Sequence, residues 1–308
     1  IALRDTLINE GALDKLLYYI KNAERRSLVK NTIWAFHQFC NGKTPPKYEA
    51  VSTFLDYILQ SMTKFGDDLD VVNDCTWILG YFCDHYMKKT VQNLSTLNML
   101  PQIVKVLEID NSAPIMPCLR ILGGFVSKCA ATTQEVVDSG ALDVFPKLLG
   151  HPNASIRKEI CWMISNIAAG TLLQLETLVT KGYVKLMTKV LKEEESIIKY
   201  EAVWALCNFT LVEKAELVRS IFEDNIVDTV CYILKFKQAK YIAVGLEAMT
   251  NLLKLGKTFF TNQDGTNPVA IKLEQNNMFD YLEGLQYHES EVVYEKSIQM
   301  IESYLEVE

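Results

Sequence analysis

The chain has 308 residues, 49% of them apolar, so it can bury an extended core. Its net charge of −7 and its pI near 5.3 argue against a general nucleic-acid binder, whose surface would be basic. No apolar run approaches the roughly 18 residues of a membrane-spanning helix, and the N-terminus lacks a signal-peptide pattern, so we expect no membrane partner.

Turn signals divide the chain into helical segments at regular distances. In chain order they are Gly11, Asn98, Gly140, Gly182, Asn225 and Asn277. Glycine and asparagine at such points suit a turn or cap between helices. The steps from 98 to 140, 182 and 225 are 42, 42 and 43 residues, which predicts a repeat of that length.

The last step is longer, because Asn277 follows Asn225 by 52 residues. The polar stretch 261–268 is therefore the predicted insertion, a surface loop. Each repeat is expected to hold a short helix, a middle helix that begins at the Gly or Asn, and a long third helix such as 153–169. The acidic run 193–195 is expected to be a solvated turn, and residues from about 268 to 308 a capping repeat.

The third helices carry two rows of residues at the same period. The first row is Trp34, Trp77, Arg120, Trp162, Trp204 and Glu247. The second row, four residues further on, is Gln38, Tyr81, Gly124, Asn166, Asn208 and Asn251. Residues four apart share a helix face, so stacked repeats place indoles beside amides. A period of 42 or 43 residues is typical of armadillo and HEAT solenoids. We predict an all-α, right-handed superhelical armadillo solenoid, a single domain over residues 1–308 with about seven and a half repeats.

The residues around the tryptophans favour binding over packing alone. A carboxylate three residues before and an asparagine one turn after accompany Trp162 and Trp204. Parallel indoles leave slots for the stems of Lys or Arg, with a cation–π attraction of roughly 0.5–2 kcal/mol per contact. Asp74, Glu159 and Glu201 can pair with the terminal charges, and the asparagine amides can hold an extended backbone. The predicted ligand is an extended peptide rich in Lys and Arg.

Several segments together resemble the importin-α (karyopherin-α) family of armadillo adaptors. They are 34–46, with its Pro45-Pro46 pair, 74–77, 158–166, 201–208 and 294–304. The resemblance implies that the chain corresponds to the third through tenth repeats of the family. It also implies a nuclear import adaptor that recognises nuclear localisation signals and shuttles between cytoplasm and nucleus. The chain opens with Ile1 rather than Met, so we expect a fragment of a longer protein. The resemblance implies that the family's first repeats and its N-terminal segment that binds importin-β are absent from this fragment.

The family's two signal-binding sites can be carried over position by position. The resemblance places in the minor site Arg120, Glu159, Trp162, Asn166, Glu201, Trp204, Asn208 and Asn251. It leaves a remnant of the major site at Trp34, Gln38, Asp74, Trp77, Tyr81 and Asp84. The charge of Arg120 is expected to repel a basic ligand and to separate the two sites. The C-terminal repeat would bind the nuclear export receptor.

Three positions depart from the family pattern. Gln38 and Gly124 stand where asparagines are expected, and Asn41 stands where the family has arginine. Gly124 follows Gly123 inside a helical pattern, so a kink is expected there. These changes predict a divergent member whose minor site is stronger, relative to its truncated major site, than is usual in the family.

Two other interpretations stay open. An armadillo scaffold of the β-catenin type would bind acidic or amphipathic partners without recognising localisation signals. A regulatory fragment could have lost cargo binding. An enzyme is not expected, because the four histidines, 37, 85, 151 and 288, share no motif and no phosphate-binding loop or nucleophile elbow occurs. We expect no cofactor and no metal, and we expect the eight cysteines to be buried free thiols.

Overall fold

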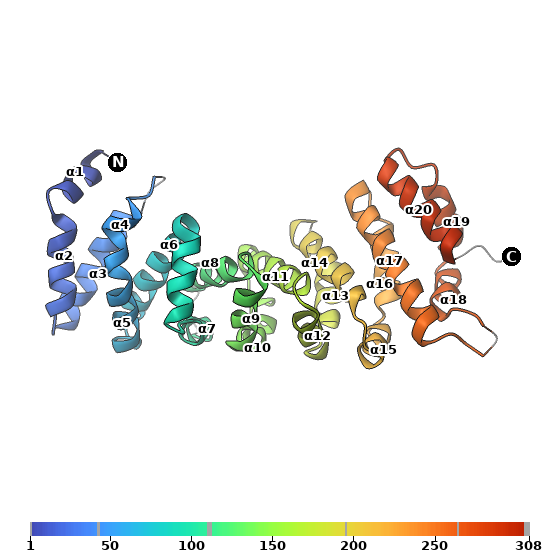
Figure 1. Cartoon of the computed structure of the whole chain (residues 1–308), viewed down its shortest axis with the longest axis horizontal. Helices are drawn as coiled ribbons and strands as arrows, with labels where there is room; N and C mark the ends of the chain where they lie inside the picture. Colours follow the sequence, from blue (N-terminus) through green and yellow to red (C-terminus); the bar gives the residue numbers. More distant parts are fainter. Residues whose placement is uncertain (1, 42–43, 110–112, 195, 264, 305–308) are drawn as a thin grey trace. The chain divides into compact units, whose positions relative to one another are not determined.

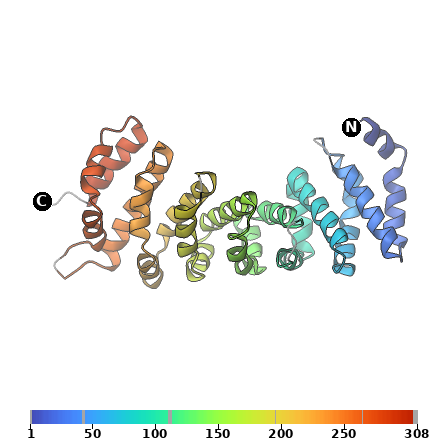
Figure 2. The same cartoon turned by 180° about the vertical axis from the view of Figure 1, so that it is seen from behind.

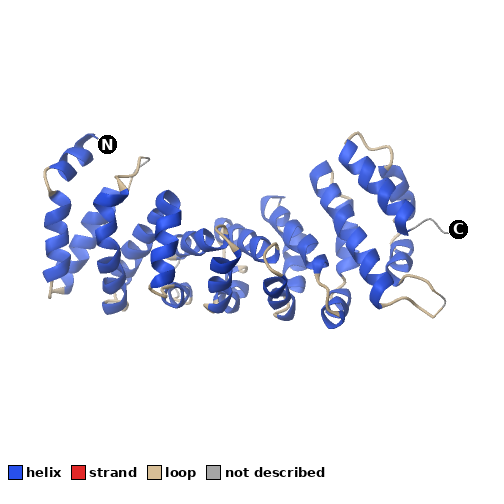
Figure 3. Ribbon diagram, in the orientation of Figure 1, coloured by secondary structure: helices blue, strands red, loops and turns tan. Residues whose placement is uncertain are grey.

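The computed structural model describes residues 2–41, 44–109, 113–194, 196–263 and 265–304. The secondary structure of these residues is helical, and Figure 3 shows no strand among them. In order along the chain (Figure 1), the helices are α1 (Ala2–Asn9), α2 (Ala12–Asn22), α3 (Arg26–Cys40), α4 (Tyr48–Val51), η1 (Ser52–Phe54), α5 (Leu55–Lys64), α6 (Leu69–Thr96), α7 (Leu100–Leu107), α8 (Ile115–Val126), α9 (Ala130–Asp138), α10 (Ala141–Leu148), α11 (Ala154–Ala168), α12 (Leu172–Thr180), α13 (Tyr183–Glu193), α14 (Ser196–Asn208), η2 (Phe209–Leu211), α15 (Ala215–Glu223), α16 (Ile226–Leu234), α17 (Ala239–Phe259), α18 (Pro268–Gln275), α19 (Phe279–Leu285) and α20 (Glu291–Tyr304).

From α9 on, the helices follow one another in groups of three, as the sequence predicts. The chain forms two compact units, residues 1–150 and 151–308. Helix α6 of the first unit joins the third helix of one group to the first helix of the next across a break at Tyr86. In the first unit the third helices α3, α6 and α8 pack in succession. In the second unit α11 packs on α14, α14 on α17, and α17 on α20, the last two lying side by side in Figures 1 and 2. All-α armadillo packing is thus present in each unit.

The turn residues have the backbone that their chemistry favours. Gly11, Gly140 and Gly182 have φ angles of 79°, 87° and 79°. Asn98, Asn225 and Asn277 have φ angles of 50°, 58° and 52°. A left-handed backbone costs glycine little and asparagine less than most residues, because other Cβ atoms crowd the carbonyl oxygen. The predicted turns before the middle helices are confirmed.

The core follows the apolar stripe of the third helices. On α11, Ile156, Ile160, Ile164 and Ile167 are each at most 1% exposed. Burial of side chains of this size contributes about 1.5–3 kcal/mol each. In the first unit, Phe36 of α3 stacks on Phe54 of η1 with ring centroids 3.9 Å apart. The apolar face of each third helix is therefore buried in the core. The opposite face carries polar and aromatic residues.

The sequence separation of polar contacts between neighbouring repeats is larger where the insertion at 261–268 is predicted. Asn208 contacts Ser165, which lies 43 residues earlier in the chain. Near the C-terminus, Asn276 contacts Asp228, 48 residues earlier, and Tyr281 contacts Leu234, 47 residues earlier. The longer separations agree with added residues between α17 and α18, where the sequence predicts a loop.

Two local expectations are wrong. Helix α8 runs from Ile115 to Val126 through both glycines, and the break in helical geometry lies in α6, where Tyr86 has φ −133° and ψ 32°. In the run 193–195, Glu194 is not a solvated residue of a turn. Its side chain is 16% exposed and accepts two hydrogen bonds from the guanidinium of Arg157, one of them 2.9 Å from Nη2 to Oε2. The first glutamate, Glu193, instead ends α13, and residue 195 lies outside the described residues.

Candidate functional site

The second unit brings two tryptophan–asparagine pairs onto adjacent helices. Trp162 and Asn166 lie on α11, and Trp204 and Asn208 lie on α14, which packs against it. Both tryptophans remain accessible, with Trp204 40% exposed and Trp162 half-buried. The indole surfaces on the two helices are thus available to a ligand that crosses both.

The asparagine amides are held in place by the chain itself. Asn166 Nδ2 donates to the carbonyl oxygen of Trp162 at 2.8 Å, and Asn208 Nδ2 donates to that of Ser165 at 3.3 Å. Asn251 Nδ2 donates to the hydroxyl of Thr210 at 3.1 Å. An amide has two N–H groups and a carbonyl oxygen, so each side chain keeps a donor and an acceptor for a peptide backbone. These bonds fix the direction in which the remaining groups point.

An aromatic contact positions Trp204. The ring of Tyr241, at the start of α17, meets the indole edge-on with centroids 6.4 Å apart. Tyr241 is itself 4% exposed and stacks on Tyr200 at 4.2 Å. Neither row of the sequence predicts a role for Tyr241, because this residue lies outside both. Only the packing of α14 on α17 brings it to Trp204.

The acidic residues of the second unit differ in their surroundings. Glu201 is half-buried on α14 and makes no ion pair within the described part of the chain. Burial raises the pKa of its carboxyl above the ordinary value, while the positive charges of Lys158 and Lys240 oppose that shift. Glu159 is half-buried on α11. Glu201 is therefore a partly desolvated carboxylate beside an accessible indole, which suits a cationic ligand.

The first unit places Trp34, Trp77 and Arg120 on successive third helices. Trp34 on α3 is 57% exposed, the most accessible indole of the chain, and Gln38 one turn later is also exposed. Trp77 on α6 is half-buried, and the guanidinium of Arg120 from α8 lies 5.6 Å from the centre of its ring. Arg120 thus contacts residues of the predicted major-site remnant.

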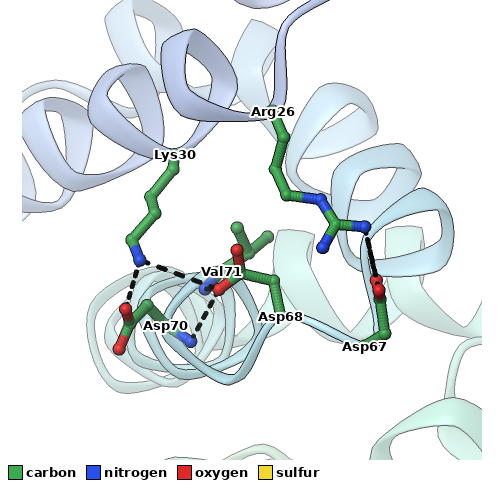
Figure 4. A network of polar contacts seen from close by, with 6 residues as sticks. All are labelled: Arg26, Lys30, Asp67, Asp68, Asp70 and Val71. Carbon is green, nitrogen blue, oxygen red and sulfur yellow. Dashed lines mark hydrogen bonds and ion pairs between the residues drawn. The ribbon is translucent and has the colours of Figure 1, made fainter.

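The two carboxylates of the predicted major-site remnant, Asp74 and Asp84, have partners within the chain. Asp74 Oδ1 lies 3.1 Å from Nδ1 of His37, and Asp84 Oδ2 lies 3.0 Å from Nη1 of Arg120. Figure 4 shows a further group where α6 begins. There Arg26 pairs with Asp67 at 2.8 Å, and Lys30 contacts Asp68 and Asp70. Asp68 also caps α6 by accepting from the N–H groups of Asp70 and Val71.

Tyr81 occupies the amide row in the first unit. Among the described residues, its hydroxyl is buried without a hydrogen-bond partner, as is the side-chain oxygen of Asn73. Burial raises the pKa of Tyr81 to about 12, so the phenol stays neutral at physiological pH. Its ring lies 4.2 Å from that of His85, centroid to centroid. Tyr81 therefore offers a ligand a ring surface rather than an amide.

Neither a metal site nor a membrane span emerges from the described ranges. No group of three or more His, Cys, Asp or Glu side chains there is placed to hold a metal ion. Within the same ranges, every helix is too short or too polar to cross a bilayer. The eight cysteines are free thiols, and Cys129 is the exposed one. The expectation of buried thiols is therefore correct for seven positions and wrong for Cys129.

Comparison with known proteins supports the repeat assignment. Residues 129–169 match the model of the armadillo/beta-catenin-like repeat, and residues 267–308 match that of the atypical Arm repeat. Among solved structures, an engineered protein superposes with a TM-score of 0.76 at 18% identity, covering 97% of this chain and 69% of its own. A designed armadillo-repeat protein in complex with the peptide (KR)4 superposes with a TM-score of 0.67 at 23% identity, covering 81% and 98%. The fold defines the chain as an all-α armadillo-repeat solenoid.

The sequence relatives narrow this class. Importin subunit alpha-4 of Arabidopsis thaliana is 31% identical over 297 residues, which cover 95% of this chain and 54% of the relative. Importin subunit alpha-1a of Oryza sativa subsp. japonica is 29% identical over 303 residues, which cover 98% and 57%. The chain is a member of the importin-α family. It spans little more than half the length of these relatives.

Proposed function

We propose that the chain belongs to a nuclear import adaptor and binds extended, Lys- and Arg-rich segments of cargo proteins. The single observation that carries the proposal is the pairing of Trp162–Asn166 with Trp204–Asn208 on the packed helices α11 and α14. Accessible indoles accept cationic stems, and the oriented amides suit the backbone of an extended peptide. Half-buried Glu201 adds an unpaired carboxylate within the described part of this unit.

The same proposal assigns partners and location by family membership. Cargo would bind on the third helices, importin-β on a segment outside this chain, and the export receptor on the repeat that contains α18, α19 and α20. Such an adaptor moves between cytoplasm and nucleus. Catalysis forms no part of this proposal.

Calorimetric titration with a basic peptide tests the cargo site. A peptide of about eight alternating Lys and Arg residues, at about 3.3 Å per residue, spans roughly three neighbouring helices. We expect salt-sensitive binding that is strongly weakened, but still measurable, in Trp162→Ala with Trp204→Ala. Tyr287→Ala is the matched control, because Tyr287 is 89% exposed and follows α19, away from α11 and α14. Full binding by the double variant would refute this site.

A scaffold of the β-catenin type is the second candidate, favoured by lysines near the second-unit site. Lys199 lies 5.0 Å from the ring centre of Phe236, and Lys240 lies 4.6 Å from that of Tyr241. Such cations suit an acidic ligand. Binding of a peptide of alternating Glu and Phe, without binding of the basic peptide, would favour the scaffold.

A further inference from the structure

The chain's own cations engage the acidic groups on the third helices of the first unit. Lys30 of α3 lies between Asp68 and Asp70 at the start of α6, as Figure 4 shows. Arg120 of α8 pairs with Asp84 of α6 and also lies over the ring of Trp77. A basic ligand would seek the same carboxylates and the same indole.

Helix geometry places these contacts on the same helix faces as Trp34 and Trp77, the faces proposed to bind the ligand. Lys30 lies one turn before Trp34 on α3, so the two share a face. On α6, Asp70 and Asp74 are one turn apart, and Trp77 lies three residues beyond Asp74. Lys30 and Arg120 therefore reach the same strip of α6 from the helices on either side, since α3 and α8 both pack against α6.

The second unit lacks this arrangement at Glu201, whose carboxylate makes no ion pair within the described residues. The two units thus differ in one property that matters for a cationic ligand. In the first unit the ligand must displace Lys30 before it gains Asp70, and Arg120 before it gains Asp84. At Glu201 the charges of Lys158 and Lys240 act without a direct ion pair, so the ligand gains the carboxylate without breaking one.

We infer that Lys30 and Arg120 are built-in competitors that lower the affinity of the first unit for basic peptides and direct such ligands to the second unit. This inference rests on the proposed function, since it concerns the same class of ligand. Both cations are partly exposed, with side chains 38% and 42% accessible, so each contact is weak and reversible. Removal of each cation should raise the affinity of the first unit about two- to fivefold.

The test uses the full chain with its second-unit tryptophans replaced. The parent variant is Trp162→Ala with Trp204→Ala, and the test variant adds Lys30→Ala and Arg120→Ala. Titration with the alternating Lys–Arg peptide should show an affinity about four- to twenty-five-fold higher in the test variant. A further change, Trp34→Ala with Trp77→Ala, should abolish that gain.

A matched control separates local competition from net charge. Lys89→Ala with Lys105→Ala also removes two positive charges from the first unit, but at other positions. Lys89 pairs with Glu49, and Lys105 lies exposed on α7. If this control gains as much affinity as the test variant, general electrostatics explains the effect and the inference is overturned. Unchanged or undetectable binding in the test variant overturns it as well.

Two further measurements keep the result decisive. Circular dichroism on heating checks that each variant folds, and Lys30→Gln with Arg120→Gln repeats the test with longer neutral side chains. Failure of the proposed function has a different signature, because it would appear as no peptide binding by the unsubstituted chain. A gain in the test variant would then still identify the two cations as competitors.

Discussion

The side-chain amide of Asn208 donates to the main-chain carbonyl of Ser165 on the preceding third helix, 3.3 Å away. The bond joins α14 to α11 beside the two indoles, so it couples the orientation of a proposed ligand-binding group to the packing of two repeats. One repeat later, Asn251 also donates to the preceding repeat, but its acceptor is the side-chain hydroxyl of Thr210 in η2.

Asn208→Ala should therefore weaken both peptide binding and folding. Loss of one hydrogen bond costs about 0.5–1.5 kcal/mol of unfolding free energy. Loss of the amide that would hold the peptide backbone should lower affinity by a similar free energy. Urea unfolding and calorimetry measure the two effects. Asn276→Ala is the control, since this residue contacts Asp228 away from α11 and α14, and its affinity should equal that of the unsubstituted chain.

Tyr241→Ala should disorder Trp204 and destabilise the second unit. Tyr241 is 4% exposed and contacts both Tyr200 and Trp204, so truncation leaves a cavity that costs about 3–5 kcal/mol. Tyr241→Phe keeps the ring and should retain stability within about 1 kcal/mol. Thermal unfolding measures the stability of each variant, and the fluorescence of Trp204 reports the order of its side chain. Equal stability of the two variants would contradict the role of the ring.

Gly124→Ala should stabilise the first unit by about 0.5–1 kcal/mol. Gly124 lies inside the unbroken helix α8, and an added Cβ would lie 3.5 Å from the Cβ of Cys83, an ordinary contact. Gly140→Ala is the contrasting variant, because its φ of 87° strains any side chain. Denaturant unfolding should rank Gly124→Ala above, and Gly140→Ala below, the unsubstituted chain.

Cys129 should react first with a thiol reagent. Its thiol is exposed at the start of α9, where hydrogen bonds from Thr132, the backbone one foremost, lower its pKa. Burial raises the pKa of the other seven thiols, to about 12 for Cys40 and Cys161. A lower pKa means more reactive thiolate at neutral pH. Mass spectrometry after brief labelling should find one adduct, absent in Cys129→Ser. Rapid labelling of several thiols would contradict the burial of the remaining seven.

Sequence period alone was enough to predict the repeats, the turns and the two rows. Turn residues such as Gly182 and residues of the first row such as Trp204 recur at a fixed distance in the sequence, because each repeat buries the same face. The armadillo fold and the importin-α family are confirmed, whereas the roles of the row residues stay predictions. The kink expected at Gly124 was a wrong prediction, because helix α8 is buried and its packing keeps the glycine in helical geometry.

The missed contacts depend on distances between helices that no single segment contains. Tyr241 reaches Trp204 from the start of the next third helix. The pairs of Arg26 with Asp67 and of Lys30 with Asp70 join residues 41 and 40 apart, close to one repeat. Opposite charges separated by about one repeat were therefore a signal in the sequence, and a search for them at that spacing would have found these pairs.

Glu201 should make peptide affinity depend on pH around the raised pKa of its carboxyl. Burial raises the pKa of its carboxyl above the ordinary value of about 4.3, so it gains a proton in the folded chain before it would in the unfolded one. A cationic ligand favours the ionised form. Affinity for the Lys–Arg peptide should therefore fall as pH decreases through this raised pKa, and Glu201→Gln should lack that component.

The raised pKa of Glu201 also determines how the free energy of unfolding changes with pH. Above the folded-state pKa the buried charge destabilises the fold, and the cost is relieved as pH falls toward the unfolded-state pKa. Glu201→Gln should therefore be more stable than the unsubstituted chain at neutral pH, by a margin that disappears in acid, while it binds the peptide about two- to fivefold more weakly. Unfolding and titration across the pH range test both, with Glu193→Gln, an exposed residue paired with Lys189 on the middle helix α13, as the control. A stability margin that grew in acid would contradict burial as the cause.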